Sequence, residues 1–393
     1  MDFVSFSLNY WEDLWQSRHQ IMSALAQKHK VLFVSPPHDL SEVFRPHKAN
    51  GMPQSGLVHR QTNLHTFVFP KYLAQSYRFP RFQKLVSSFR ERKVRQVMRK
   101  LCFHDSILFI WHPQFAELAG RLGEMLTCYY VDDDFAGYVG QSEEQRQALL
   151  RKEDELLRRA DVVFANGPVL LREKNRYGNA INLPMTADFE LFSRSRLAGT
   201  QVPRELEAIP HPRIGFIGNV NDKVDMGLTL QLAKEFVNWS FLFVGPVNIR
   251  DPRYQMEVKL ARQLPNIFFL GAKPRELLPN YIKGLDVCAM CYRREGWARS
   301  IYPLKLHEFL ASGKPVIGTG LESIREFSEV VRIADTPEEW REGLRLALAD
   351  KNEALAERRV QVAYENRLET RIATIETALE AKLQQKKPIS NQT

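Results

Sequence analysis

Short apolar segments alternate with helical segments along most of the chain, and this alternation restricts the possible folds more than any other feature of the sequence. A strand followed by a helix and another strand needs a crossover connection, which produces a parallel sheet covered by helices. The pattern predicts strands at 31–35, 64–69, 107–112, 127–131, 160–165, 180–184, 213–218, 240–245, 267–271, 286–291 and 315–319, with a polar loop at 48–61. The predicted fold class is therefore α/β.

A polar stretch divides this alternation into two runs. Residues 193–212 lack periodicity and contain Gly199 and three prolines, a composition typical of a linker. A chain of 393 residues is long enough for two domains that each bury a core. We therefore predict domains at 1–195 and 213–365, a linker at 196–212, and at 366–393 a helix that could pack back on the N-terminal domain, followed by a frayed tail. Both domains are expected to be doubly wound and Rossmann-like, with ligands in the cleft where the carboxyl ends of their strands face each other.

The sequence also indicates a compartment. It has no run of about 18 apolar residues, and its N-terminus lacks the basic and long apolar parts of a signal peptide. Cys288 and Cys291 have metal-type spacing, but they lie in an apolar segment that predicts a buried strand, with no second ligand pair nearby. We therefore predict core packing rather than metal or redox chemistry for these thiols, and a reducing, cytoplasmic location.

The net charge of +9 is spread unevenly. Residues 78–100 carry nine Lys or Arg side chains and one acid, with apolar residues between them. A basic amphipathic segment can lie on an anionic membrane surface, where each cation contributes about 1 kcal/mol. A solvated helix that packs its apolar face on its own domain and a nucleic-acid-binding surface are the alternatives. We favour peripheral contact with the cytoplasmic face of a membrane and expect no nucleic-acid partner.

The segment 299–317 combines the features of a phosphate site and a sugar site. Pro303 suits the first turn of a helix, and a loop that leads into a helix offers free backbone N–H groups to phosphate. Arg299 and Lys305 add positive charge at this helix start. Glu308 lies one turn further on an otherwise apolar helix, where its carboxylate could bind the paired hydroxyls of a ribose.

The same segment resembles the nucleotide-sugar-binding motif of family-4 retaining glycosyltransferases of the GT-B fold, the glycosyl transferases group 1. The matching form is Ser-x-x-Pro-x-Lys-x-x-Glu-Tyr/Phe-Leu-Ala-x-Gly-Lys-Pro-Val. The commoner form has two glutamates eight positions apart; here Ser300 replaces the first and Glu308 is the second. The resemblance implies that Glu308 binds the nucleotide ribose, and that Ser300, Ile301 and Tyr302 lie in the region that contacts the donor sugar.

Two further loops in the second half resemble donor-binding segments of the same family. Gly218 follows a predicted strand, and glycine lets the backbone approach a ligand closely. In the family an Arg just after this Gly and a Lys a few residues later hold the diphosphate; Asn219 and Lys223 stand at or next to these positions. Ala272 and Lys273 follow another predicted strand, in a segment whose family counterpart contacts the base. The resemblance therefore implies a donor site that includes all five residues.

The N-terminal half supplies candidates for the acceptor side. Its opening segment resembles the Trp-x-x-x-Trp-Gln motif of a subset of the family, in which this loop borders the acceptor and the phosphates. On that basis we place Trp11, Arg18 and His19 there, since aromatic faces stack on sugar rings. His112 ends a predicted strand, where the family has a His near the donor sugar. Asp133 lies in an acidic strand end that could orient an acceptor hydroxyl or bind a divalent ion, and we favour the hydroxyl.

The resemblance implies an enzyme that moves a sugar from a nucleotide sugar to an acceptor hydroxyl with retention, in cell-surface polysaccharide or glycolipid synthesis. The acceptor would be a glycan or a lipid-linked glycan. His112, Arg299 and Lys305 are the predicted catalytic residues, and because the cations neutralise the leaving diphosphate, no metal or other cofactor is expected.

Three alternatives stay open at this point. A nucleotide-sugar epimerase would share the fold and the donor. A dinucleotide-dependent oxidoreductase would need a complete glycine fingerprint, but the Gly-x-x-Gly at residues 215–218 lacks the third glycine. A non-catalytic protein that binds membranes or nucleic acid would explain residues 78–100, but it would not explain Glu308 and its motif.

Overall fold

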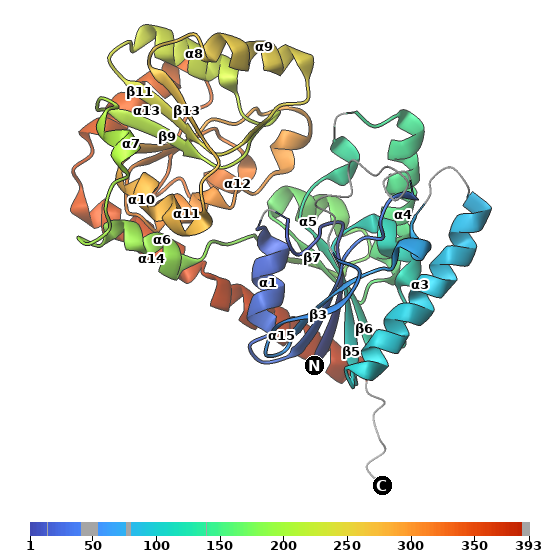
Figure 1. Ribbon diagram of the computed structural model, residues 1–393. Coiled ribbons are helices and arrows are strands. Elements are labelled where there is room, and N and C mark those ends of the chain that lie inside the picture. The colour runs from blue at the N-terminus through green and yellow to red at the C-terminus, as the bar shows by residue number, and fades with distance from the viewer. Residues whose placement is uncertain (14, 41–53, 76–79, 139, 387–393) are drawn as a thin grey trace.

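The computed structural model describes residues 1–13, 15–40, 54–75, 80–138 and 140–386, and in the helix that begins at Pro80 it describes side chains only from Val86 onward. Within the predicted basic stretch, Arg78 lies outside the described residues. The chain forms two α/β domains, and its last helix returns from the second domain to the first (Figure 1). The predicted α/β class is confirmed.

The N-terminal domain is built on an eight-stranded sheet with the order β3-β4-β2-β1-β5-β6-β7-β8. Its strands are β1 (Asp2–Phe6), β2 (Lys30–Val34), β3 (Gly56–Gln61), β4 (Leu64–Val68), β5 (Ser106–Ile110), β6 (Leu126–Val131), β7 (Val162–Ala165) and β8 (Ala180–Asn182). Its helices are α1 (Ser17–Leu25), η2 (Lys71–Leu73), α3 (Pro80–Lys100), η3 (Pro113–Leu118), η4 (Phe135–Gly137), α4 (Glu143–Arg159) and α5 (Pro168–Lys174). Neighbouring strands are parallel except for the antiparallel pair β3 and β4.

The C-terminal domain is built on a six-stranded parallel sheet with the order β13-β11-β9-β14-β15-β16, a doubly wound topology. Its strands are β9 (Arg213–Ile217), β11 (Ser240–Val244), β13 (Ile267–Gly271), β14 (Val287–Met290), β15 (Val316–Gly318) and β16 (Arg332–Ile333), beside the short pair β10 (Val220–Asn221) and β12 (Val247–Asn248). Its longer helices are α8 (Met226–Glu235), α9 (Pro252–Ala261), α13 (Pro337–Ala349) and α14 (Glu353–Glu365). Its shorter helices are η6 (Arg275–Leu277), α10 (Leu278–Lys283), η7 (Gly296–Ser300), α11 (Lys305–Leu310) and α12 (Glu322–Arg325).

All the predicted strands are present, but two strands of the N-terminal sheet were not predicted. Strand β1 lies in the middle of the sheet between β2 and β5. Serine interrupts its apolar run, yet Ser5 is fully buried and accepts a hydrogen bond of 2.9 Å from the indole N–H of Trp111. Strand β3 occupies part of the predicted loop at 48–61, and its polar residues form a strand because β4 supplies its backbone hydrogen bonds.

The chain passes between the domains at two places. Phe192 is buried in the core of the C-terminal domain, and so are Leu206 and Ile209 of the predicted linker. The first crossing therefore lies earlier than predicted, ahead of α6 (Phe189–Ser193), and much of the stretch at 196–212 packs on the C-terminal domain. The second crossing leads into α15 (Leu368–Lys386), which packs its apolar face into the core of the N-terminal domain and contacts α1.

The structure shows where the two closely spaced thiols lie and whether a described helix could cross a membrane. Cys288 lies in the buried strand β14 and Cys291 follows it, and burial raises the pKa of these thiols to about 12 and about 11. The predicted buried strand is therefore confirmed. Among the residues that the structure describes, no helix combines the length and the apolar character needed to cross a bilayer.

Strands β9 and β11 end side by side in a tight backbone contact. Gly245 has a φ of +149°, and a Cβ atom there would overlap the carbonyl oxygen of Gly218. We expect Gly245→Ala to lower the free energy of unfolding by about 2 kcal/mol, because the backbone would have to move away from its strained position. Denaturant unfolding would measure this loss. The matched control Gly199→Ala, in a loop with open space around the added methyl, should not destabilise the protein.

Candidate functional site

A pocket of about 400 Å³ lies between the two domains. Residues beyond the carboxyl ends of β6, β9, β11 and β13 line it, together with the start of α1 and the start of α11. Ligands of doubly wound sheets bind at such strand ends. The predicted site residues that line this pocket are Arg18, Asp133, Gly218, Asn219, Lys223, Ala272, Lys273, Ile301, Tyr302, Lys305 and Glu308.

Two lysines without ion-pair partners form the positive part of the pocket. The ammonium nitrogen of Lys305 lies 4.8 Å from the ring centre of Phe216, and the side chain packs against Gly218. The ammonium of Lys223 lies 5.8 Å from the ring centre of Tyr292, which Lys305 also approaches. Neither lysine forms an ion pair with a described residue. Aromatic faces hold these cations in place while their hydrogen-bond donors remain unpaired, which suits an anionic ligand.

Burial perturbs both lysines. It lowers the pKa of Lys305 to about 7, and the nearby positive charge of Lys223 acts in the same direction. Burial also lowers the pKa of Lys223, while the carboxylate of Asp133 acts in the opposite direction. A bound anion would favour the protonated state of both side chains. Strongly perturbed groups in a cleft are typical of functional sites.

Glu308 supplies a buried carboxylate on the same helix. Its side chain is 9% exposed, and it makes no hydrogen bond to a described residue. Burial raises its pKa to about 7, although the positive charges of Lys305 and Arg275 oppose this shift. The carboxylate therefore has free oxygen atoms facing the pocket, and two such atoms can accept hydrogen bonds from the neighbouring hydroxyls of one sugar.

The N-terminal domain contributes a network of polar side chains. Arg18 donates to Asp132 at 2.8 Å and to Asn9 at 2.6 Å. Burial raises the pKa of Asp132 to about 6, and Arg18 opposes this shift. The next residue, Asp133, accepts a hydrogen bond of 2.7 Å from the hydroxyl of Tyr138. These groups line the pocket opposite Lys223 and Lys305, where a hydroxyl group of a second substrate could bind.

Two predicted acceptor-side residues lie behind the pocket instead of in its wall. His19 is fully buried and caps α1, because its Nδ1 accepts from the backbone N–H of Gln16 at 3.0 Å and its Nε2 lies 3.2 Å from the carbonyl oxygen of Tyr10. Trp11 packs edge-on against His19 and Phe33. Both side chains therefore hold in place the loop that leads into α1, whose first turn carries Arg18.

Three other predicted residues also lie outside the pocket wall. His112 caps η3 by accepting from the N–H of Gln114 at 3.1 Å, and burial lowers its pKa to about 3. Arg299 is exposed and donates to Glu173 of α5 at 2.9 Å, which joins the two domains. The hydroxyl of Ser300 is buried and donates to the carbonyl oxygen of Trp297. Arg299 and Ser300 therefore use their polar groups away from the pocket.

Several lining residues were not predicted. Asp132 and Tyr138 belong to the network around Arg18, and Trp15, Gln20 and Arg275 lie where the pocket opens toward α1. The acidic run at 132–134 was a signal for Asp132. The Trp-x-x-x-Trp-Gln motif was a signal for Trp15, whereas no local pattern in the sequence indicates Tyr138, Gln20 or Arg275.

Comparisons with known proteins show what the chain is similar to. Residues 211–363 match the family model described as Glycosyl transferases group 1. This match covers the C-terminal domain. The chain is also 32% identical, over 190 residues, to the teichuronic acid biosynthesis glycosyltransferase TuaH of Bacillus subtilis strain 168. That alignment covers 46% of each chain, so the match spans about half the length of the relative.

Solved structures match the chain over nearly its full length. Sucrose-phosphate synthase from Thermosynechococcus elongatus matches with a TM-score of 0.67 and 16% identity, covering 97% of this chain and 99% of that one. An alpha,alpha-trehalose-phosphate synthase (UDP-forming) from Burkholderia xenovorans matches with a TM-score of 0.66 and 13% identity, covering 97% and 100%. At these identities the likeness concerns the fold, and it confirms the predicted GT-B architecture of two Rossmann-like domains.

Proposed function

We propose that this protein is a retaining glycosyltransferase that moves a sugar from a nucleotide-sugar donor to a hydroxyl group of an acceptor. The observation that carries the proposal is the approach of Lys223 and Lys305 to the same ring, that of Tyr292. Lys305 packs against Gly218, and the free carboxylate of Glu308 lies one turn further along α11 in the same pocket. A nucleoside diphosphate presents a matching arrangement, because its phosphates need cations and its ribose presents paired hydroxyls. The group 1 family of the C-terminal domain supports the same function.

The proposed reaction is a displacement on one face of the donor sugar. The acceptor oxygen forms a bond to the anomeric carbon while the bond from that carbon to the diphosphate oxygen breaks. The leaving diphosphate gains negative charge, which Lys223 and Lys305 stabilise, and one of its oxygen atoms takes the acceptor proton. Asp133 and the Arg18–Asp132 pair would orient the acceptor hydroxyl from the opposite wall. This route needs no cofactor, since the preorganised cations supply the electrostatic stabilisation.

A panel of nucleotides tests the donor site. We expect one nucleoside diphosphate to raise the melting temperature of the purified protein, because a ligand that binds only the folded state stabilises it by mass action. The matching nucleotide sugar should then transfer labelled sugar to an acceptor. A melting-temperature rise with NAD alone would contradict the proposal and favour an oxidoreductase. Conversion of the donor without any acceptor would favour an epimerase.

The pH dependence of nucleotide binding follows from the two groups on α11. Lys305 binds a diphosphate only when protonated, so affinity should fall as pH rises above its pKa of about 7. Glu308 accepts ribose hydrogen bonds best when ionised, so affinity should also fall as pH drops below its pKa of about 7. We expect the affinity for the nucleoside diphosphate, measured by titration calorimetry, to be highest near neutral pH. On either side of this maximum it should change up to about tenfold per pH unit. Lys305→Met should remove the alkaline decline and Glu308→Gln the acidic one; unchanged declines would contradict these assignments.

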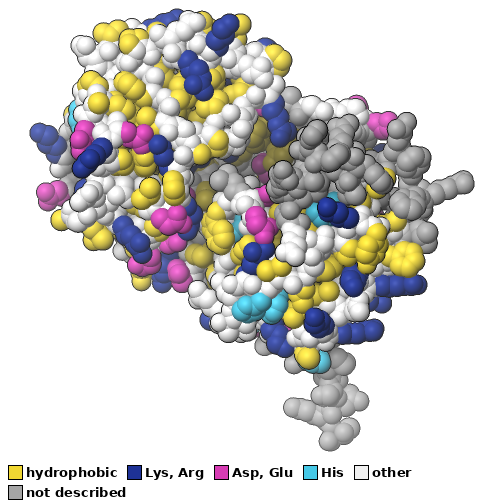
Figure 2. All heavy atoms as spheres, in the orientation of Figure 1, with side chains coloured by type: hydrophobic (Ala, Val, Ile, Leu, Met, Phe, Trp, Pro, Cys, Tyr) yellow, Lys and Arg dark blue, Asp and Glu magenta, His cyan; other side chains and the backbone are white. Residues whose placement is uncertain are grey.

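We further propose that the enzyme works at the cytoplasmic surface of a membrane, on a glycan or lipid-linked acceptor in cell-surface polysaccharide synthesis. Helix α3 buries Val94, Val97 and Met98 in its own domain and leaves Phe89 47% exposed on the other side. The exposed basic residues on the described part of this helix are Arg92, Arg99 and Lys100. Figure 2 shows Lys and Arg side chains beside hydrophobic ones over this helix. The name of the Bacillus subtilis relative supports a role in polysaccharide synthesis.

Vesicle binding tests the membrane proposal. We expect the protein to sediment with phosphatidylcholine–phosphatidylglycerol vesicles at physiological salt, and to bind pure phosphatidylcholine vesicles weakly. Arg92→Ala and Lys100→Ala should each lower the partition coefficient about fivefold, since each cation near an anionic surface contributes about 1 kcal/mol. The exposed Lys234 of α8 provides the control variant Lys234→Ala, which should bind like the wild type. Equal binding of all variants to the anionic vesicles would contradict the assignment of membrane binding to α3.

A further inference from the structure

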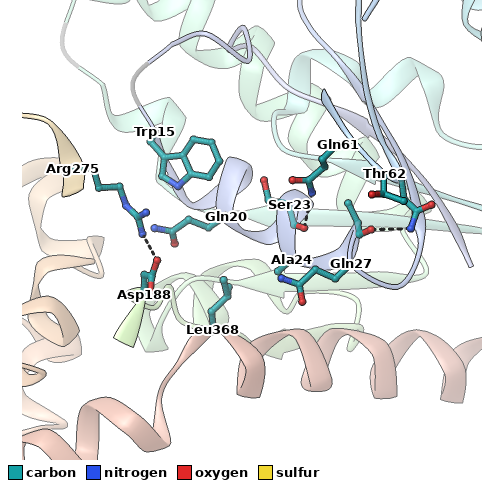
Figure 3. A pocket seen from close by; sticks show the side chains of 12 residues that line it. Trp15, Gln20, Ser23, Ala24, Gln27, Gln61, Thr62, Asp188, Arg275 and Leu368 are labelled. Atoms are coloured by element: carbon teal, nitrogen blue, oxygen red, sulfur yellow. Dashed lines mark hydrogen bonds and ion pairs between the residues drawn. The ribbon is translucent and has the colours of Figure 1, made fainter. Parts of the chain in front are cut away.

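A second cavity lies beside the cleft, along α1 (Figure 3). Its volume of about 520 Å³ falls in the range of ligand pockets, roughly 300–1,000 Å³. It shares Trp15, Gln20 and Arg275 with the cleft pocket, so the two spaces adjoin each other. Asp188 ahead of α6, Leu368 at the start of α15 and the turn between β3 and β4 complete its wall. We call this cavity the side pocket.

Side-chain amides dominate the polar lining of the side pocket. Gln20 is only 5% exposed, yet its amide makes no hydrogen bond to any residue that the structure describes. In Figure 3 this amide points from α1 toward the Arg275–Asp188 pair. Gln27, two residues beyond the end of α1, is exposed, and its amide also has no partner among the described residues. Because an amide carries both donors and acceptors, Gln20 is suited to a ligand that both donates and accepts hydrogen bonds.

An aromatic ring stands next to these amides. Trp15 is 38% exposed where it lines the side pocket. Its ring stacks on His19 with the ring centres 5.3 Å apart, and it meets Trp11 edge-on, so its orientation is fixed from behind. A tryptophan ring beside amide groups can bind a sugar ring, because the ring covers the apolar face of the sugar while the amides bind its hydroxyls.

The charges of the side pocket restrict the ligand further. Its only charged lining residues in the described chain are Arg275 and Asp188, and these pair with each other at 3.0 Å. The side pocket therefore has no free cation for a phosphate or a uronic acid. Its aliphatic lining consists of Ala24, Ala26 and Leu368, which offers little surface to an acyl chain. The matching ligand is neutral and rich in hydroxyl groups.

We infer that the side pocket binds neutral sugar residues of a glycan acceptor, beyond the residue that receives the new sugar in the cleft. The inference rests on the proposed transferase function, because the acceptor hydroxyl would enter the cleft between Trp15 and Gln20. A longer acceptor would then contact α1 and both crossings between the domains. Its binding would depend on residues that the donor does not touch.

Direct binding of neutral oligosaccharides to the full chain tests this inference. The probes are neutral hexose and N-acetylhexosamine oligosaccharides, graded from mono- to pentasaccharide and measured by titration calorimetry. Gln27→Ala and Ala24→Trp change only the side pocket, and Gln96→Ala on the exposed face of α3 is the control. Thermal stabilisation by nucleoside diphosphates is recorded for each variant, since it reports on the cleft and on folding.

We expect the longest probes to bind at least tenfold more tightly than the monosaccharide, and both side-pocket variants to lose this gain while the control keeps it. Two outcomes would contradict the glycan site in the side pocket and leave the proposed function unaffected. One is nucleotide binding without oligosaccharide binding, and the other is oligosaccharide binding that both variants retain. Oligosaccharide binding that the variants abolish, without binding of any nucleotide, would keep the glycan site and overturn the transferase proposal. A preference for anionic over neutral probes would also contradict the inference.

Discussion

Replacing Lys305 with Met should lower kcat/KM about 100- to 1,000-fold. The ammonium group lies at the start of α11 against Gly218, where it would meet the leaving diphosphate as negative charge develops. Removing one preorganised group that stabilises transition-state charge typically costs this much. Methionine keeps the length and apolar character of the side chain, so its contacts with Phe216 and Tyr292 should persist. Steady-state kinetics with the nucleotide sugar that the binding panel identifies would measure the loss.

The stability of the same variant separates catalysis from misfolding. Burial holds the pKa of Lys305 near 7, below the ordinary value of about 10.5 that it regains on unfolding. Protonation at neutral pH therefore favours the unfolded state, and stability should rise with pH through this window in the wild type. Lys305→Met removes this penalty, so the ligand-free variant should melt no lower than the wild type at pH 7. The exposed Lys351 provides the control Lys351→Met. A variant that keeps its activity, or that loses it only through unfolding, would contradict the proposed role.

The elements that could be predicted are those whose residues show their structure in the local sequence pattern. Strands such as β9, β11 and β14 are continuous apolar runs that are buried on both faces, and such runs are visible in the sequence. Strand β1 contains the buried Ser5, whose polarity is satisfied by Trp111 more than 100 positions away. Strand β3 is polar and partly exposed, and it exists because β4 pairs with it. These two strands depend on partners that a local pattern does not reveal.

The candidate site divides in the same way. Gly218, Lys305 and Glu308 lie in segments where a strand or loop leads toward a helix. The backbone of such a segment is set by neighbouring residues, so the sequence motifs could indicate these positions. The structure brings all three into one pocket. His19 and His112 could not be separated from site residues, because a histidine that caps a helix and one that faces a cleft look alike in a sequence. Their caps depend on the backbone conformation of the neighbouring loops.

Residues at the domain boundary were the hardest to predict. Arg275 lines both the cleft pocket and the side pocket. It also forms an ion pair with Asp188, which lines the side pocket. Arg299 had a promising position in the motif, but Glu173 of the other domain pairs with it. Which charge remains free for a ligand depends on how the two domains meet, and that relation lies outside the reach of periodicity or spacing.

Replacing Glu308 with Gln should weaken the binding of the cognate nucleoside diphosphate by about 2–3 kcal/mol, or about 30- to 150-fold. Hydrogen bonds to a charged group contribute about this much, and they are strongest where the carboxylate is shielded from water. Glutamine has nearly the same shape, but it carries no charge and offers one acceptor oxygen. Titration calorimetry at pH 8, where Glu308 with its pKa of about 7 is mostly ionised, would measure the loss.

A dideoxy nucleotide tests whether the ribose is the partner of Glu308. If the carboxylate binds the ribose hydroxyls, the wild type should bind the 2′,3′-dideoxynucleotide as weakly as Glu308→Gln binds the normal one, and the variant should hardly distinguish the two ligands. The exposed Glu276 of η6 supplies the control Glu276→Gln, which should behave like the wild type. A variant that still prefers the normal nucleotide to the same degree would show that Glu308 acts elsewhere, for example by setting the charge of Lys305. That result would move the ribose to another wall of the pocket. Glu308 would then act on the donor through the neighbouring Lys305, which lies one helical turn away.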